Sequence, residues 1–270
     1  MIKDLTLGQF FPADSVIHKF DPRLKIVLFI VILLAILFFV GNFYSLAFVS
    51  IFVILLMLLS KVPFSMYIKN LKVILPILIF TMLLNLFYTS DGTVLVEFWI
   101  VKITTGGISR SIFMSLRVTF LIFTSAILTY TTSPNDLTDA IDRLLSPLKY
   151  IGLGRAVHTM SMMMTIALRF IPTLVEETEK IMNAQKARGA DFETGKLMDR
   201  IKAIIPILIP LLISAIRRAY DLAEAMECRC YNGGEGKQRM KQLHVNRNDI
   251  LGTAFILLCC GVLIFLNTVL

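Results

Sequence analysis

The sequence predicts an all-α, polytopic membrane protein with about five transmembrane helices and three amphipathic helices outside the bilayer. Three observations support this fold class. Of the 270 residues, 56% are hydrophobic and only 17% are charged, which is more apolar surface than a soluble domain of this size can bury. Five apolar runs are about as long as a bilayer is thick. Most of the charge falls in one further region, where apolar residues recur every three or four positions.

The five apolar runs are the predicted spans. They cover residues of about 24–40, 43–59, 73–88, 108–130 and 250–270. We expect Pro76 near the start of the third helix, where a missing N–H is tolerated. Residues 94–101 are apolar but too short to cross, so we expect them in the membrane interface, ended by Gly106 and Gly107.

The spans divide the chain into three regions. Residues 1–132 hold four spans, and residues 249–270 form the last one. Residues 133–248 hold 17 of the 27 Lys and Arg and 13 of the 19 Asp and Glu. Basic residues gather before the first span, after the second and after the fourth. The positive-inside rule therefore predicts that the N-terminus and residues 133–248 are cytoplasmic and that the C-terminus is outside.

Residues 133–248 predict three helices. Ser133, followed by Pro134 and Asp136, is typical of a helix start. Pro147 and Gly152 are expected to end this first helix. The second helix is expected at about 155–187 and the third at about 197–228, because apolar residues recur there in steps of three and four.

Both long helices combine an oily part with proline. Pro172 should bend the second helix. Pro206 and Pro210 lie in the oily first half of the third helix, which we expect to be buried in protein or to dip into the bilayer. Four methionines on the second helix indicate either core packing or an adaptable surface for exchangeable partners. These methionines are Met160, Met162, Met163 and Met164.

The same short pattern ends both long helices. The two copies are Ala187-Arg188-Gly189 and Cys228-Arg229-Cys230. Each places an arginine, with its planar fork of donors, between small residues that let another protein approach closely. The plainer alternative is a cation that stabilises a helix C-terminus through the helix dipole. Glu224 and Glu227 either are ordinary surface charges or orient Arg229 or contact a partner.

Two neighbouring patterns invite a chemical interpretation that the sequence does not support. Cys228 and Cys230 have no second Cys or His pair nearby to complete a metal site. Residues 233–238 resemble a phosphate-binding loop, but Tyr231 stands where its first glycine belongs and Gln238 where it needs Ser or Thr. We therefore predict no metal, cofactor or catalytic site. The scattered basic residues also argue against a nucleic-acid partner.

Taken together, these features resemble the transmembrane T component of energy-coupling factor (ECF) importers of vitamins and metal ions. The resemblance covers nearly the whole chain. It rests on the N-terminal spans, the stretch from Ser133 to Leu148, the segment Arg169-Phe170-Ile171-Pro172 and the two arginine motifs. The first motif matches the Ala-Arg-Gly pattern of the family in full, whereas the second keeps only its arginine. That departure puts in doubt a second helix end that relies on glycine.

The resemblance implies a non-enzymatic coupling subunit in the cell membrane of a bacterium or archaeon. The two long coupling helices would cross, and their ends would dock into two homologous ATPase subunits. The docking residues would be Ala187, Arg188, Gly189, Cys228, Arg229 and Cys230, supported by Glu224 and Glu227. A membrane-embedded, substrate-binding S subunit would contact a coupling face. The residues expected on that face are Met160, Met163, Met164, Phe170, Pro172, Pro206, Leu208 and Pro210.

Two other functional classes stay open as alternatives. A stand-alone secondary transporter needs ionisable groups within its spans, but no Asp or Glu lies between Asp21 and Asp91. Arg117 lies inside the fourth span and is either a functional charge or a cation that reaches the outer surface. A membrane-embedded lipid enzyme needs clustered acid, base or metal ligands, and the three histidines are far apart in the sequence.

Overall fold

The computed structural model describes residues 10–89, 93–98, 101–152, 154–190, 197–232 and 245–269. In chain order its elements are α1 (Pro22–Phe39), α2 (Phe43–Ser60), α3 (Phe64–Tyr88), β1 (Val94–Phe98), β2 (Val101–Thr104), α4 (Thr105–Thr131), α5 (Pro134–Leu144), the 3-10 helix η2 (Ser146–Ile151), α6 (Gly154–Ala187), α7 (Leu197–Cys228) and α8 (Arg247–Val269). The described residues form two compact units. We call residues 10–137 and 245–269 the bundle unit and residues 138–232 the crossed-helix unit.

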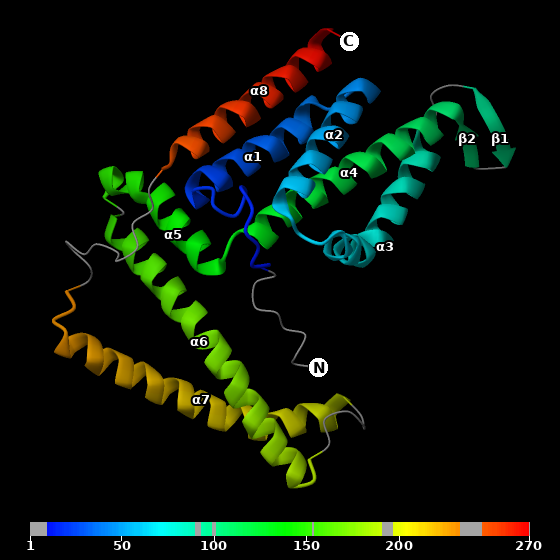
Figure 1. The fold of residues 1–270 in the computed structure, drawn as a ribbon. Helices are drawn as coiled ribbons and strands as arrows, with labels where there is room; N and C mark the ends of the chain where they lie inside the picture. The colour runs from blue at the N-terminus through cyan, green and yellow to red at the C-terminus, as the bar shows by residue number, and fades with distance from the viewer. Residues whose placement is uncertain are drawn as a thin grey trace. The chain divides into compact units, whose positions relative to one another are not determined.

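The bundle unit is built from helices that run alongside one another, with α1, α2, α4 and α8 as its main body (Figure 1). Its core holds an apolar cluster that includes the fully buried side chains of Val53, Tyr67 and Ile127. Burial of such side chains is what holds these helices together where they meet, since each helix satisfies its own backbone hydrogen bonds.

Helices α1 and α8 run in the same direction through the bundle unit. Gly252, near the start of α8, lies against Phe20 just before α1, so that a Cβ built on the glycine would be 2.7 Å from the phenylalanine ring. At the other end, a Cβ on Gly41 would be 2.7 Å from Oδ1 of Asn267. Two close approaches at opposite ends fix the helices as parallel neighbours.

The five predicted spans are confirmed as helices α1, α2, α3, α4 and α8, each long and apolar enough to cross a membrane. A sixth candidate, Lys202–Cys228, lies within α7. The sequence had indicated too short an oily run there. In the structure this oily run is part of one continuous helix, and that helix is long and apolar enough to cross a membrane.

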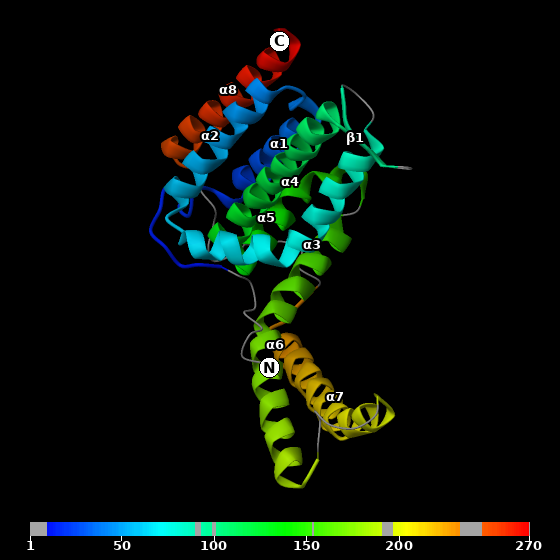
Figure 2. The same cartoon turned by 90° about the vertical axis from the view of Figure 1, so that its right-hand side faces the viewer.

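Helix α3 differs from the prediction in where it begins. It starts at Phe64, so Pro76 lies inside the helix rather than near its start, and that expectation was wrong. The preceding segment contains Lys69 and Lys72 and reads as a loop, yet it is helical. Figure 2 shows that α3 is bent, as an internal proline removes one backbone donor and crowds the preceding turn.

A β-hairpin occupies the segment that we expected to lie as an apolar run in the interface. Strands β1 and β2 pair antiparallel, with Val96 opposite Ile103 and Phe98 opposite Val101. The β-branched residues of this segment, Val94, Val96, Val101, Ile103 and Thr104, favour a strand over a helix. Gly106 and Gly107 do not end this segment as predicted, because they lie in the first turn of α4. The Thr104 hydroxyl caps that turn by accepting the N–H of Gly107 at 3.0 Å.

The predicted start of α5 is confirmed in atomic detail. The Ser133 hydroxyl accepts the N–H of Asp136 at 3.1 Å and donates to the Asp136 carboxylate at 2.7 Å, which satisfies a free donor of the first turn. The helix ends at Leu144, earlier than expected, and the chain continues as η2. Pro147 therefore lies within η2, and Gly152 follows it with a positive φ of 84°.

In the crossed-helix unit, the two longest helices of the described chain cross each other (Figures 1 and 2). The observed bounds, Gly154–Ala187 for α6 and Leu197–Cys228 for α7, agree with the predicted ones to within a residue. Pro172 lies near the middle of α6, and Pro206 and Pro210 lie in the first half of α7.

Candidate functional site

Both long helices end in the same backbone structure, a Schellman cap. At the end of α6, the N–H of Ala190 donates to the Gln185 carbonyl at 3.0 Å, and the N–H of Gly189 donates to that of Lys186 at 3.0 Å. This 6→1 and 5→2 pair of bonds satisfies carbonyls that a helix end leaves free. Arg188 occupies the position just before the left-handed residue, and its side chain is exposed.

The end of α7 repeats this arrangement residue for residue. The N–H of Tyr231 donates to the Met226 carbonyl at 3.1 Å, and the N–H of Cys230 donates to that of Glu227 at 2.9 Å. Arg229 again precedes the left-handed residue and is exposed. The flanking Cys228 is exposed as well.

The doubt about a helix end without glycine is resolved by Cys230. It adopts a left-handed φ of 54°, in place of the φ of 88° that Gly189 has at the equivalent position of α6. A residue with a Cβ pays about 1–2 kcal/mol for that conformation, so the cap at α7 forms in spite of its sequence. The helix therefore ends without glycine.

An ion pair joins α6 to α7. The Arg218 guanidinium donates to the Glu177 carboxylate at 2.6 Å, and their side chains are 35% and 22% exposed. A hydrogen bond from Ser214, and then the charge of Arg218, hold the pKa of Glu177 below its usual value. The carboxylate therefore stays ionised across the physiological range.

The ion pair lies at the same distance along the chain from both terminal arginines. Arg188 lies 11 residues after Glu177, and Arg229 lies 11 residues after Arg218. We call these two segments the arms, and at 1.5 Å per residue each is about 16 Å long. Eleven residues make about three full turns, so each terminal arginine lies within about 20° of the helix face that carries the ion-pair residue of that helix. The two ends are thus close to equivalent in reach and rotation about the ion pair.

Partly exposed apolar side chains lie along α6 and α7 on the N-terminal side of the ion pair. Met160, Met163 and Met164 of α6 are 66%, 59% and 44% exposed, and Leu208 of α7 is 55% exposed. Phe170 is half-buried, and Pro172, Pro206 and Pro210 are exposed. Leu208 belongs to a longer series of exposed apolar residues of α7. Before Arg218 the series includes Ile204, Ile205, Ile209, Leu212, Ile213 and Ile216, and Tyr220 follows it.

An exposed apolar surface of this kind is usually covered by lipid or by another protein. A soluble monomer rarely exposes so continuous an apolar stripe, which marks a protein or membrane contact. The residues predicted on the coupling face therefore lie on a surface available to lipid or to another membrane protein. Glu224 and Glu227, predicted near the second docking end, are exposed on the polar arm of α7.

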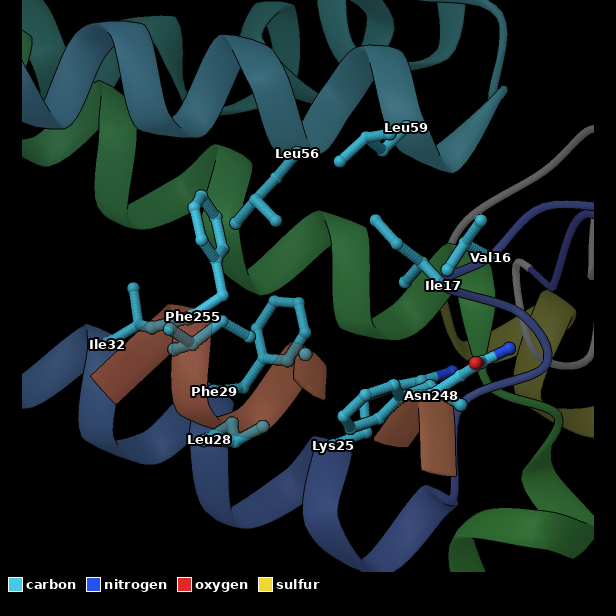
Figure 3. Close-up of a pocket in the computed structure, with 13 residues that line it drawn as sticks. Val16, Ile17, Lys25, Leu28, Phe29, Ile32, Leu56, Leu59, Asn248 and Phe255 are labelled. Carbon is cyan, nitrogen blue, oxygen red and sulfur yellow. The ribbon is translucent and has the colours of Figure 1, made fainter. Parts of the chain in front are cut away.

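The bundle unit contains a pocket of about 120 Å³ between α1, α2, α8 and the segment before α1 (Figure 3). Its walls are apolar, with Phe29, Leu56 and Phe255 among them, while Lys25 and Asn248 lie at one end. Among the described residues that line it, none carries a carboxylate, an imidazole or a thiol. It therefore offers a hydrocarbon-lined space rather than a site for acid–base chemistry.

The cation inside the fourth span has a structural partner. Arg117 donates through Nε to the Ile36 carbonyl at 3.1 Å. That carbonyl belongs to the last turn of α1, where backbone acceptors lack a partner within the helix. In the structure, Arg117 therefore has a role that neither interpretation named: it joins α4 to α1.

A second internal cation was missed by the sequence analysis. Lys25 is 2% exposed and donates to the Thr131 carbonyl, the last of α4, at 3.0 Å. Asp136 and Asp249 are near enough to interact with its charge. Lys25 thus connects the points where the chain leaves α4 and where it enters α8. Its position beside Arg23 had suggested only a flanking charge for topology.

The remaining sequence motifs add no site to the part of the chain that the structure describes. No group of three or more His, Cys, Asp or Glu able to hold a metal ion lies within the described ranges. Cys228 and Cys230 are free thiols. The glycine-rich residues 233–238 lie outside the described residues.

Comparison with known proteins places this arrangement in a family. A family model described as cobalt transport protein (CbiQ) matches residues 13–241. An energy-coupling factor transporter transmembrane protein EcfT from Ruminiclostridium cellulolyticum is 48% identical over 253 residues, which cover 94% of this chain and 93% of that protein. The protein of the same name from Clostridium kluyveri is 46% identical, covering 97% of each chain.

The similarity also holds at a greater evolutionary distance. The EcfT protein of Bacillus subtilis is 41% identical over 267 residues, which cover 99% of this chain and 100% of its own. Near-complete coverage means that the spans and both arginine-bearing helices are shared. The chain therefore belongs to the family of transmembrane components of energy-coupling factor transporters, multi-pass proteins of the bacterial membrane.

Proposed function

We propose that this chain is the non-catalytic coupling subunit of an ATP-driven importer of a vitamin or a metal ion. Its two arginine ends bind two homologous ATPase subunits, and the apolar faces of α6 and α7 bind a substrate-binding S subunit in the membrane. One observation carries the proposal. Two exposed arginines, Arg188 and Arg229, end helices with identical caps and equal arms.

The equality of the two ends favours a partner with two equivalent sockets. A single, asymmetric partner would place no such constraint on arm length or on cap geometry. Two copies of related ATPase subunits would present matching grooves, and an arginine can fill each one with several directed hydrogen bonds. ATP hydrolysis is then the work of the partners, because this chain supplies no nucleotide-binding motif of its own in the described residues.

The apolar halves of α6 and α7 favour a role in transmission. A nucleotide can move a distant subunit only through contacts that differ between two states. Helices α6 and α7 each combine an apolar half with a polar arm, so each can contact a membrane protein and a soluble one. In this proposal the helices act as levers between the ATPases and the S subunit.

In this proposal the N-terminus and the crossed-helix unit are cytoplasmic, because the arginine ends must meet the soluble ATPases there. Parallel packing of α1 and α8 supports this orientation, because it sends both helices across the membrane in the same direction. With a cytoplasmic N-terminus, we therefore propose that the C-terminus is outside. Thiol labelling of the exposed Cys228 and Cys230 tests it. A membrane-impermeant maleimide should react in inside-out vesicles and not in intact cells, and labelling in intact cells would reverse the topology.

Reconstitution tests the proposal as a whole. The purified chain is mixed with an ATPase pair and candidate S subunits, and the complex is isolated by size-exclusion chromatography. We expect co-elution of all components and ATP hydrolysis only when the ATPases are present. Hydrolysis by the chain alone that a substitution in it abolishes would refute the non-catalytic assignment.

A charge on the apolar face separates docking from transport. Leu208→Glu should leave ATPase co-elution intact and abolish substrate uptake, because a carboxylate cannot enter an apolar contact without a large desolvation penalty. Ala219→Glu, on the exposed polar side of the crossing, is the matched control and should transport normally. If Leu208→Glu also loses the ATPases, or transports normally, the lever role is wrong.

A further inference from the structure

The ion pair between Glu177 and Arg218 joins α6 to α7 well before either helix end, so docking of the ends alone does not explain it. We propose that this pair is a positioning device that fixes the point at which α6 and α7 cross and thereby keeps their two arms equal. This inference rests on the proposed function, since the arms matter because their ends dock.

The pair is specific to one place on each helix. Its members are 41 residues apart in the sequence and meet at 2.6 Å, with Ser214 as a third, hydrogen-bonded member. Their immediate neighbours, Glu176 and Arg217, are exposed. Glu177 and Arg218 thus face the other helix, whereas the like charges next to them, Glu176 and Arg217, face away from it.

Packing alone does not determine this crossing point. Apolar contacts are non-directional, and α7 before the crossing presents isoleucine and leucine over many consecutive positions. Its ridges repeat every three or four residues, so a slip of one turn replaces each contact with a similar one. A single acid that meets a single arginine has no equivalent one turn away, which is how buried polar groups specify register elsewhere.

A slip of the crossing would damage docking at both ends. One turn of helix is about 5.4 Å, and moving the crossing by a turn on one helix makes its arm longer or shorter than the other by that amount. Two equivalent sockets cannot both be filled by arms of unequal length. The pair therefore acts on docking through Arg188 and Arg229, without contact with the ATPases.

The direct test is the distance between the two helix ends in the free, full-length chain. Spin labels are placed on native Cys228 and on Ala187→Cys, with the other cysteines replaced by serine, and pulsed electron resonance gives the distance distribution. We expect one narrow distribution with the pair intact. Glu177→Gln and Arg218→Gln should each broaden or shift it, and the exchange Glu177→Arg with Arg218→Glu should restore it.

Matched controls separate positioning from a general loss of charge. Glu176→Gln and Arg217→Gln remove the same charges from the exposed neighbouring positions and should leave the distance unchanged. An unchanged distance in both Glu177→Gln and Arg218→Gln would overturn the inference. So would a failure of the charge exchange to restore the distance in a chain that still inserts and folds.

Binding of the ATPase pair is the second readout. Each single substitution should weaken it about two- to fivefold, which is the range for partly exposed ion pairs, and the charge exchange should recover most of the loss. If the distance changes as expected while ATPase binding does not, the positioning role stands and docking through these ends is refuted. The two claims therefore fail separately.

Discussion

Exchanging the residues that end the two long helices should change the stability of those ends in opposite directions. Gly189 and Cys230 hold the same position in the two caps, with φ of 88° and 54°. The left-handed conformation costs a residue with a Cβ about 1–2 kcal/mol, whereas glycine adopts it freely. A Cβ built on Gly189 meets no atom within 4 Å, so alanine there acts through backbone conformation alone.

Gly189→Ala should therefore destabilise the last turn of α6 by about 1–2 kcal/mol, which makes its opening about 5- to 30-fold more frequent. Cys230→Gly should stabilise the last turn of α7. Its gain is smaller, about 0.5–1 kcal/mol, because glycine also gives the open state more conformational freedom. Both positions are exposed, so little packing is gained or lost.

Hydrogen exchange measures both effects at the amides that close the caps. The N–H of Ala190 reports on α6 and the N–H of Tyr231 on α7. Exchange should accelerate at Ala190 in Gly189→Ala and slow at Tyr231 in Cys230→Gly. Gly261→Ala, where a Cβ also meets open space, is the control and should affect neither amide. Unchanged exchange at Ala190 in Gly189→Ala would refute the assignment of these ends as equivalent left-handed caps.

Further predictions concern the thiols and two polar residues of the bundle unit. In detergent, a thiol reagent should modify exposed Cys230 rapidly and Cys259, which is 9% exposed, slowly; equal rates would contradict the fold. Lys25→Met should destabilise the bundle by about 3 kcal/mol in thermal unfolding, because the buried Thr131 carbonyl loses its donor and Asp136 and Asp249 lose the attraction of the Lys25 charge. Lys25→Arg should have a milder effect. Burial lowers the pKa of His18, so its folded form favours the neutral ring: stability present above the ordinary pKa near 6.5 is lost as pH falls through the folded value. His18→Gln should flatten that dependence in unfolding scans as the pH falls below about 6.5.

Helix positions were predictable because they rest on local signals. Apolar length located five spans, and three- and four-residue periodicity located α6 and α7 almost to the residue. The cap at Ser133 follows from side-chain chemistry within four residues. Where local signals conflicted, the prediction was wrong. Pro76 and the lysines before it suggested a later start for α3. For the segment that forms β1 and β2, the prediction used its hydrophobicity and not its β-branched residues.

Pairings across the fold were not predictable, because periodicity identifies a face and not what the face meets. Nothing near Glu177 in the sequence indicates Arg218, which is 41 residues away. Likewise, the sequence indicates only that Lys25 is a basic residue that flanks the first span, and its contact with the Thr131 carbonyl is visible only in the structure. The two arginine motifs could be located from sequence, but the equality of their arms could not, since it depends on where the helices cross.

Co-purification of the ATPase pair with Arg188→Ala/Arg229→Ala tests the central claim most directly. Removing an arginine from a desolvated contact typically costs about 2–5 kcal/mol, so each single variant should bind at least about 30-fold more weakly. The double variant should lose the ATPases and substrate uptake while it still inserts into the membrane, and Arg217→Ala, at an exposed arginine near the crossing, should behave as the wild type. A double variant that retains the ATPases and transports normally would contradict docking through the two helix ends.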